Sequence, residues 1–212
     1  MNHIYDINQI TEIQNFIMDI FNVEQLNFLH ENVDTLGMHI DIVTIPPDPP
    51  KRDNWILVTI GMSAYKMNTD NPDDQYMELL IELPAEWPVD KESIKSPNNW
   101  WPIEHMYRIA RHPRRYNTWL GYGHTFSTEE CVKIENSDFV GFILSDVCEI
   151  PSGVMEYETI DGRKINFYQM IPIFEDELSF KLANDESELF YKMSEAEIFG
   201  VVDINRKSCL AE

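Results

Sequence analysis

The first regular feature of the chain is a helical repeat of apolar side chains near its start. Between Asn8 and Phe21 the apolar residues return every three or four positions, and polar residues fill most of the places between them. This spacing predicts an amphipathic helix that docks its apolar stripe on the rest of the protein. A second, short helix is predicted from Glu24 to Glu31, where the apolar residues are Leu26, Phe28 and Leu29.

Three strand-like segments follow. Met38 to Ile45 is rich in β-branched residues and stops at Pro46-Pro47, which cannot continue a ladder of hydrogen bonds. Trp55 to Ile60 is a nearly continuous apolar run, which predicts a central strand covered on both faces. Tyr76 to Leu83 alternates, so one face is predicted to be apolar and the other partly wet. Three consecutive strands of this kind indicate an antiparallel core.

A helix is predicted in the middle of the chain, after a proline-punctuated loop from Pro84 to Asn99. It opens at Trp100-Trp101-Pro102, where a proline near the first helical position costs no hydrogen bond. Four apolar residues then fall at helical spacing: Ile103, Met106, Tyr107 and Ala110. Because His112 precedes Pro113, the helix is predicted to end there.

The last third of the chain returns to strand patterns and then to helix. Phe139 to Cys148 and Lys164 to Pro172 are both apolar and rich in strand-forming residues, and Asp161-Gly162 is a hairpin signal before the second of them. Beyond Phe174 the chain is predicted to be helical and acidic. Val201 to Arg206 closes it as a short strand or a bound tail.

Length and charge narrow the classes of function. A chain of 212 residues can bury roughly 70% of its unfolded surface as one domain. Its 37 Asp and Glu against 16 Lys and Arg give a formal charge of -21, which repels the phosphates of nucleic acids. Direct nucleic-acid binding is therefore not expected. An acidic surface suits a basic protein partner, although a merely solvated surface explains the same composition.

Cysteine usage and hydropathy indicate the compartment. Cys131, Cys148 and Cys209 are odd in number and form no C-x-x-C pair, so neither a disulfide framework nor a zinc knuckle is indicated. No apolar run is long enough to span a bilayer, and the start of the chain lacks a basic region followed by an apolar core. A cytoplasmic protein that does not enter membranes is expected.

The most unusual stretch runs from Trp119 to Thr125 and combines large aromatic side chains with two glycines and a histidine. It lacks the third glycine of a dinucleotide-binding loop, and the chain has no P-loop. The stretch is therefore a packed corner or a recognition surface. Tyr122, which lies between Gly121 and Gly123, is a candidate for the recognition surface.

Each residue that could act in catalysis or bind a metal can also be explained by a structural role. His39 and Asp41 are two apart on a predicted strand and share a face, so they are a possible metal pair with His124 as a third ligand. A buried His–Asp pair is the commoner arrangement. Glu78 and Glu82 also share a face, and a solvated face is expected for them.

Other candidates are weaker still. His105 and His112 are seven apart on the predicted helix, and we expect a surface pair. Ser63 lacks a nucleophile elbow and is expected to be a turn residue. No catalytic constellation emerges.

Seven short motifs, taken in order and spacing, resemble the suppressor of fused (SUFU) domain family over roughly Met38 to Arg206. The motifs are His39-Ile40-Asp41-Ile42 before Ile45-Pro46-Pro47, Val58-Thr59-Ile60-Gly61-Met62-Ser63, Glu78-Leu79 with Leu83-Pro84, Trp100-Trp101-Pro102-Ile103, Thr118-Trp119-Leu120-Gly121-Tyr122-Gly123-His124, Asn166-Phe167-Tyr168-Gln169-Met170-Ile171-Pro172 and Val201-Val202-Asp203.

The resemblance implies an α/β (α+β) domain in which helices flank a mixed sheet. On this view residues 1–37 are an N-terminal helical segment packed on the domain, and residues 38–212 are the SUFU-like domain. The resemblance also implies binding instead of catalysis, without a cofactor. In animals such a domain is half of a larger regulator that sequesters a transcription factor. In bacteria it occurs alone and resembles the immunity partner of polymorphic toxins, and this chain is similar to that form.

Three hypotheses follow. The first is an immunity protein, or antitoxin, that binds a cognate toxin and covers its active site; the toxin is expected to be a basic nuclease. The second is a peptide-binding regulatory module that sequesters a partner protein. The third is a metal-dependent hydrolase that uses His39, Asp41 and His124. The candidate partner-binding residues are His112, Trp119, Tyr122 and His124, although His112 and Gly123 stand where the animal members carry Tyr and Asp.

Overall fold

A computed structural model describes residues 7–30, 36–90, 92–148, 150, 153–198 and 200–211 of the chain. Its helices are α1 (Ile7–Phe21), α2 (Pro97–Tyr116), α3 (Glu175–Ala183) and α4 (Glu186–Glu195). Its strands are β1 (Asn27–Leu29), β2 (Asp41–Ile45), β3 (Asn54–Ile60), β4 (Met77–Pro84), β5 (Thr125–Ser127), β6 (Gly141–Ser145), β7 (Met155–Glu158) and β8 (Lys164–Ile173). No helix among these residues is both long and apolar enough to cross a membrane.

The described strands form one mixed sheet in the order β1-β2-β3-β4-β8-β6-β5, and β7 pairs with β8 beside this path. β4 and β8 are parallel, and the other pairs are antiparallel. β8 is long enough to serve two partners along one edge: residues 164–167 pair with β7, and residues 169–173 pair with β6. The parallel pair requires a long crossover, and α2 lies within it.

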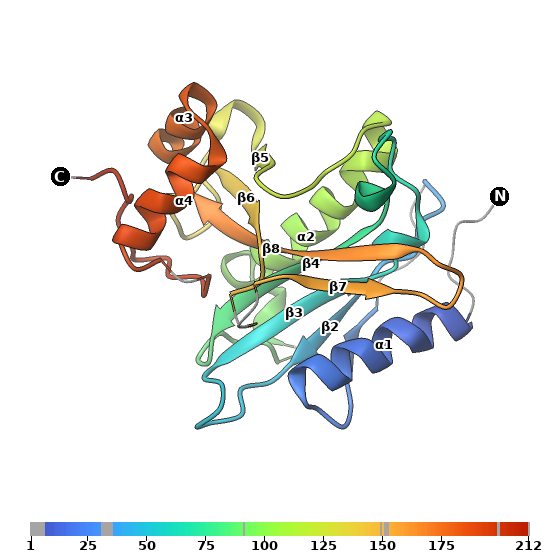
Figure 1. Ribbon diagram of the computed structural model, residues 1–212. Coiled ribbons are helices and arrows are strands. Elements are labelled where there is room, and N and C mark those ends of the chain that lie inside the picture. Colours follow the sequence, from blue (N-terminus) through green and yellow to red (C-terminus); the bar gives the residue numbers. More distant parts are fainter. Residues whose placement is uncertain are drawn as a thin grey trace.

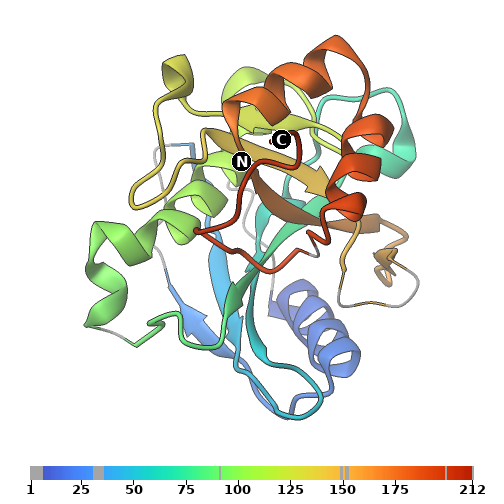
Figure 2. The same cartoon turned by 90° about the vertical axis from the view of Figure 1, so that its left-hand side faces the viewer.

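Helices cover both faces of this sheet (Figure 1). α2 buries Trp101, Ile103, Met106 and Ile109 on one face, and the turned view in Figure 2 shows it opposite the other helices. On the second face α1 packs on the β2–β4 half of the sheet. α3 and α4 pack on β6 and the end of β8 on that same face. The result confirms the predicted fold class, a mixed sheet flanked by helices.

Most elements lie where the hydrophobic pattern predicts them, with two corrections. The predicted helix from Glu24 to Glu31 is wrong, because Asn27–Leu29 forms β1 and pairs with residues 42–44 of β2. The tertiary pairing outweighs a short and irregular helical pattern. The second correction concerns α2, which begins at Pro97 and continues through Pro113 to Tyr116. It ends at Asn117, whose φ of 51° is left-handed.

The predicted wet face of β4 is also wrong, because Glu78 and Glu82 are both buried. Glu78 accepts hydrogen bonds from Thr59 Oγ1 at 2.6 Å and from the backbone N–H groups of Gly61 and Ser63, each at 3.0 Å. The Ser63 hydroxyl also donates to it, so Ser63 is more than a turn residue. Glu82 accepts from Asn54 Nδ2 at 3.0 Å. Layers on both sides of the sheet leave this face no solvent, so donors from the chain replace water.

Candidate functional site

The stretch from Trp119 to His124 leaves α2 and is fastened to the sheet at β6. Gly123 N donates to Leu144 O at 2.8 Å, and Leu144 N donates to His124 O at 2.9 Å. Gly123 has a φ of 74°, and a Cβ atom there would lie 2.5 Å from Cγ of Glu186. The residue is therefore glycine for two reasons: the left-handed backbone and the close approach of α4. Directly before these two hydrogen-bonded residues, the Tyr122 side chain reaches the surface.

The four predicted partner-binding residues do not form one cluster. Trp119 and His124 are together, with ring centroids 4.4 Å apart. Tyr122 is 44% exposed and packs its ring on Phe190 of α4, at 5.2 Å. His112 contacts a different set on α2 and β5, because its ring lies against Tyr116 and Phe126.

Two adjoining hollows meet at Tyr122 and Asp146, which line both. The first, here called the Tyr122 groove, has a volume of about 230 Å³ and runs along β7 and β8. Its charged lining residues are Asp73, Asp74, Asp146, Glu156 and Lys164. The second, the apolar hollow, has a volume of about 200 Å³, and its walls include Ile171, Phe190, Met193 and Ile198.

The carboxylates of the Tyr122 groove were not found from the sequence. Asp73 and Asp74 precede β4, Asp146 follows β6, and Glu156 lies on β7. No local motif links these positions, because the pairing of β4, β6 and β7 with β8 brings them together. From the sequence, only the overall negative charge indicated an acidic surface.

The electrostatics of this surface follow from partial burial among like charges. Burial raises the pKa of Asp146. Burial also raises the pKa of Tyr122, and the nearby Asp146 and Glu186 add to this effect. For Tyr168, burial and then Asp74 raise the pKa to about 12, and its hydroxyl forms a hydrogen bond with the Tyr122 backbone. For Tyr122 and Tyr168 the nearby carboxylates add to the effect of burial, so a further negative charge is unfavourable beside them.

His124 is also perturbed. Burial and then the charge of Lys181 lower its pKa, and Asp74 and Glu186 oppose this shift only in part. The ring is therefore neutral at pH 7, and it fills space beside Trp119. The arrangement around Tyr122 is thus an exposed aromatic side chain between an acidic groove and an apolar hollow. It can bind a basic group and an apolar side chain at neighbouring points.

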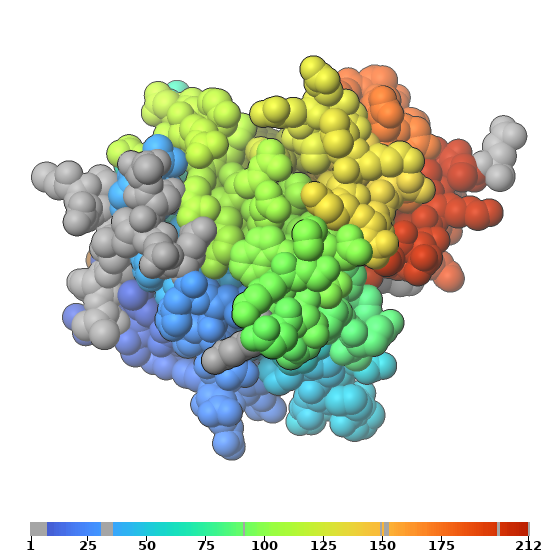
Figure 3. Space-filling view, turned by 180° about the vertical axis from the view of Figure 1, so that it is seen from behind, coloured from blue at the N-terminus to red at the C-terminus, as the bar shows by residue number. Residues whose placement is uncertain are grey.

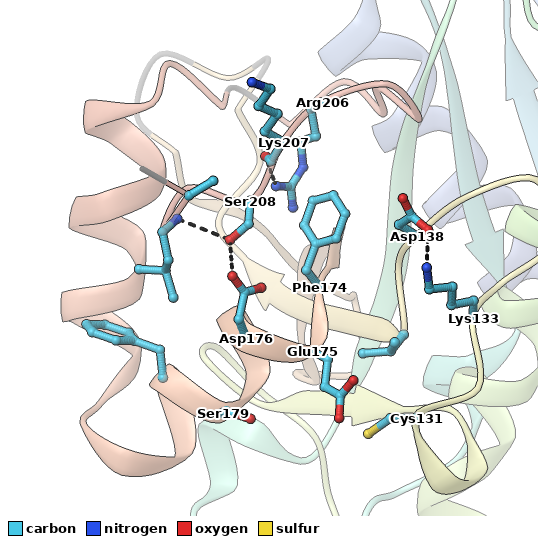
Figure 4. A pocket seen from close by; sticks show the side chains of 14 residues that line it. Cys131, Lys133, Asp138, Phe174, Glu175, Asp176, Ser179, Arg206, Lys207 and Ser208 are labelled. Carbon is cyan, nitrogen blue, oxygen red and sulfur yellow. Dashed lines mark hydrogen bonds and ion pairs between the residues drawn. The ribbon is translucent and has the colours of Figure 1, made fainter.

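A more voluminous hollow than the two at Tyr122 lies elsewhere, between α3 and the C-terminal segment, with a volume of about 1090 Å³ (Figure 4). Several of its polar side chains have partners within the chain. Ser208 Oγ donates to Asp176 at 2.6 Å, and Lys133 pairs with Asp138. Arg206 is held by Glu177. The charged residues that line it are three basic and three acidic ones, so this hollow lacks the charge imbalance of the Tyr122 groove.

The hydrolase trio is not assembled. His39 Nε2 lies 3.3 Å from Asp41 Oδ2, as the shared strand face predicts, but the third residue beside them is His30. His124 instead packs on Trp119. The expected surface pair of His105 and His112 is wrong as well, because His105 is buried and its Nδ1 lies 2.7 Å from the Trp101 carbonyl.

Comparison with known proteins identifies the architecture. The family model of the suppressor of fused protein (SUFU) matches residues 37–207. A SUFU homologue from Neisseria gonorrhoeae has a similar structure, with a TM-score of 0.69 at 18% identity over 98% of this chain and 100% of that one.

Two further solved structures share the fold. A suppressor of fused chain in the Sufu–Fu complex aligns with a TM-score of 0.68 at 14% identity over 95% of this chain and 92% of that one. Drosophila Suppressor of Fused aligns with a TM-score of 0.67 at 12% identity over 95% of this chain, which spans 51% of the Drosophila protein. No curated protein matches the sequence.

Proposed function

The chain belongs to the suppressor of fused family, and on that premise we propose that it is an immunity protein that binds a basic protein toxin and covers the toxin's active site. The SUFU domain is in general a protein-interaction module, which makes binding the first expectation for this chain. The immunity role is the more specific part of the proposal. It rests on the charge of -21 and the Tyr122 groove.

The observation that carries the proposal is the charge imbalance at the Tyr122 groove. Its lining has four carboxylates and one lysine, and that lysine is already bonded to Glu156 at 2.8 Å. A partner that places Lys or Arg in the groove supplies the missing positive charge. An apolar partner side chain would then enter the neighbouring hollow and pack on Tyr122 and Phe190. Aromatic anchors of this kind carry a large share of interface energy.

A basic toxin fits this surface better than a nucleic acid does. The basic groups with which a nuclease holds phosphates are complementary to carboxylates, so the same acidic groove that repels nucleic acid attracts the enzyme. Covering those groups blocks the substrate without any chemistry by this chain. The proposed role is therefore non-catalytic and uses no cofactor.

The test is co-expression with each basic toxin domain encoded beside the gene, in a catalytically inactive form, followed by co-purification and measurement of Kd. Tyr122→Ala is expected to weaken binding by about 30-fold, because an anchor of this kind contributes about 2 kcal/mol or more. Tyr191→Ala is the matched control: Tyr191 is 62% exposed on α4 and lines neither hollow. If the wild-type protein protects cells from none of the neighbouring toxins, the immunity role is refuted.

The open edge of β7 favours a second candidate, a regulatory module that binds an extended peptide. Among the described residues β7 pairs only with β8, and the groove runs along both strands. An added peptide strand could pair with that edge and place basic side chains in the groove. A suppressor of fused structure solved in complex with Fu supports a protein partner of this kind. If a short peptide binds nearly as tightly as its parent protein, this candidate replaces the immunity role.

A further inference from the structure

Two histidines and an aspartate meet at the edge of the sheet beside α2, away from the Tyr122 groove. His30 Nδ1 lies 3.1 Å from Asp41 Oδ2, and His39 Nε2 lies 3.3 Å from the same oxygen. The possible ligand atoms of the three residues all lie within 4.8 Å of one another. This is the single cluster of its kind among the described residues.

The sheet itself brings these residues together. β1 pairs with β2 so that Leu29 is opposite Ile42, and continuing this antiparallel register places His30 opposite Asp41. His39 precedes Asp41 by two positions, which is the spacing that puts two side chains on one face of a strand. The His30 ring is stacked on Phe28, with an interplanar angle of 6° and centroids 5.4 Å apart. Phe28 therefore orients one ligand and the backbone ladder positions the other two.

We propose that His30, His39 and Asp41 form a binding site for a divalent transition-metal ion such as Zn²⁺. Two imidazoles and one carboxylate are a donor set that zinc uses when three protein ligands leave one position open. Bonds of about 2.0 to 2.1 Å in a tetrahedron place neighbouring ligand atoms about 3.3 Å apart. The two His–Asp distances are already close to this value. Only the separation of the two histidines must adjust, and the His30 side chain is 70% exposed and can turn.

The surroundings favour a cation. The cluster contains a carboxylate and lies within a chain whose formal charge is -21. The cluster is also accessible from the surface. β1 lies beside α2, because the Tyr107 hydroxyl of that helix donates to Leu29 O at 3.2 Å. Figure 3 shows N-terminal residues (blue) at the surface next to that helix (green). Asp41 itself is mostly buried, with 15% of its side chain exposed. The ion would therefore sit at the mouth of a shallow site and keep one position for water.

One feature sets the expected affinity. Metal-binding histidines usually donate their second ring N–H to an acceptor, and Nδ1 of His39 is buried without a hydrogen-bond partner. The Asp41 carboxylate, 3.3 Å from Nε2, favours the tautomer with the proton on that nitrogen. An ion at Nε2 requires the proton on Nδ1, where no acceptor meets it, so this ligand lacks outer support. We expect a weak site that fills when Zn²⁺ is added. Filling it would link the short edge strand β1 to β2 and stabilise the fold.

The experiment is a titration of the metal-stripped full chain with Zn²⁺, followed by calorimetry and by NMR of the histidine ring nitrogens. One ion per chain is expected to bind, with shifts at His30 and His39 and a thermal midpoint that rises with the Zn²⁺ concentration. His30→Ala should weaken binding at least about tenfold, because even the loss of an outer-shell partner costs that much. His30 is exposed, so this variant is expected to fold like the wild type.

Two comparisons make the result decisive. His112→Ala removes a half-buried histidine outside the cluster and should leave Zn²⁺ binding unchanged. His39→Ala should abolish the saturable phase. Binding that is equal in wild type and His30→Ala, or that involves several weak sites without ring shifts at His30 and His39, would show that the acidic surface collects the ion and would overturn the proposal. The absence of any binding would do so as well.

Discussion

Two regions of this protein contain carboxylates that can be compared, the buried interior and the Tyr122 groove. They differ in whether the chain itself supplies hydrogen-bond donors and positive charges to those carboxylates. In the interior, Glu78 and Glu177 are fully buried and each accepts several hydrogen bonds from the chain. In the groove, Asp73, Asp146 and Glu156 are exposed, and they share one lysine with Asp74. Interior carboxylates therefore have their partners within the fold, whereas the groove has one lysine for four carboxylates, and that lysine pairs with Glu156.

The interior also contains a second, finer contrast. Burial opposes ionisation of Glu177, but Arg206 bonds both its oxygens at 2.7 and 2.8 Å, backbone N–H groups add to this, and its pKa is lowered overall. Glu78 is equally buried and has only hydroxyl and N–H donors, so burial prevails and its pKa is raised. The difference between these two buried carboxylates is therefore the guanidinium of Arg206, which Glu78 lacks. Hydrogen bonds from neutral donors do not outweigh the loss of water here.

The largest expected effect concerns the matched interior pair. Arg206→Ala would leave Glu177 buried without its partner, which is expected to cost about 3–5 kcal/mol of unfolding free energy. Lys207→Ala is the control, since this exposed neighbour should change stability by less than about 0.5 kcal/mol. Urea unfolding at pH 7 measures both. Equal stability of the two variants would break the contrast between matched and unmatched carboxylates.

A smaller effect separates the two interior carboxylates by pH. Each Glu→Gln variant, at position 78 or 177, is expected to cost about 1–3 kcal/mol, because a donor replaces an accepting oxygen. The raised pKa of Glu78 gives stability that is present below the ordinary pKa of 4.5 and is lost as pH rises through the folded-state pKa. The lowered pKa of Glu177 gives stability that is present above 4.5 and is lost as pH falls through the folded-state pKa.

The two variants should therefore show opposite trends. The cost of Glu78→Gln is expected to shrink as pH rises above 4.5, and the cost of Glu177→Gln is expected to shrink as pH falls below it. Urea unfolding of wild type and both variants across this range measures the trends. If the loss of unfolding free energy changes with pH in the same direction for both variants, Glu78 is ionised in the folded state and neutral donors are enough to keep it so.

The hydrophobic pattern predicted most elements because the two periods of helix and strand are local properties. α1 and the strands β2, β3 and β4 follow it closely. What the pattern missed depends on partners that are distant in sequence. Segment 27–29 is a strand because β2 offers an edge, and Glu78 is buried because α1 and α2 cover both faces of its strand.

The candidate site was predictable only in part, for the same reason. The glycine and aromatic stretch pointed to Tyr122, since a large aromatic side chain between two glycines has few neighbours in the chain to cover it. The carboxylates around it come from segments before β4, after β6 and on β7, and no sequence spacing connects them. His30 was missed for a similar reason, because only the β1–β2 register places it opposite Asp41.

The smallest effect on stability, and the sharpest test of the unmatched region, comes from the groove itself. Asp146→Asn removes a carboxylate whose pKa is raised by burial and which has no salt bridge among the described residues, so the unfolding free energy should change by no more than about 0.5 kcal/mol. Association with a basic partner protein should nevertheless slow, and its dependence on salt should weaken, because the groove attracts the partner through that charge.

Asp53→Asn is the control, since it removes an exposed charge from the β2–β3 connection and should leave the association rate nearly unchanged. Stopped-flow mixing at several salt concentrations measures both. If the two variants slow association equally, the partner responds to the total charge of -21 and not to the groove, and the distinction between the two regions would have no functional meaning.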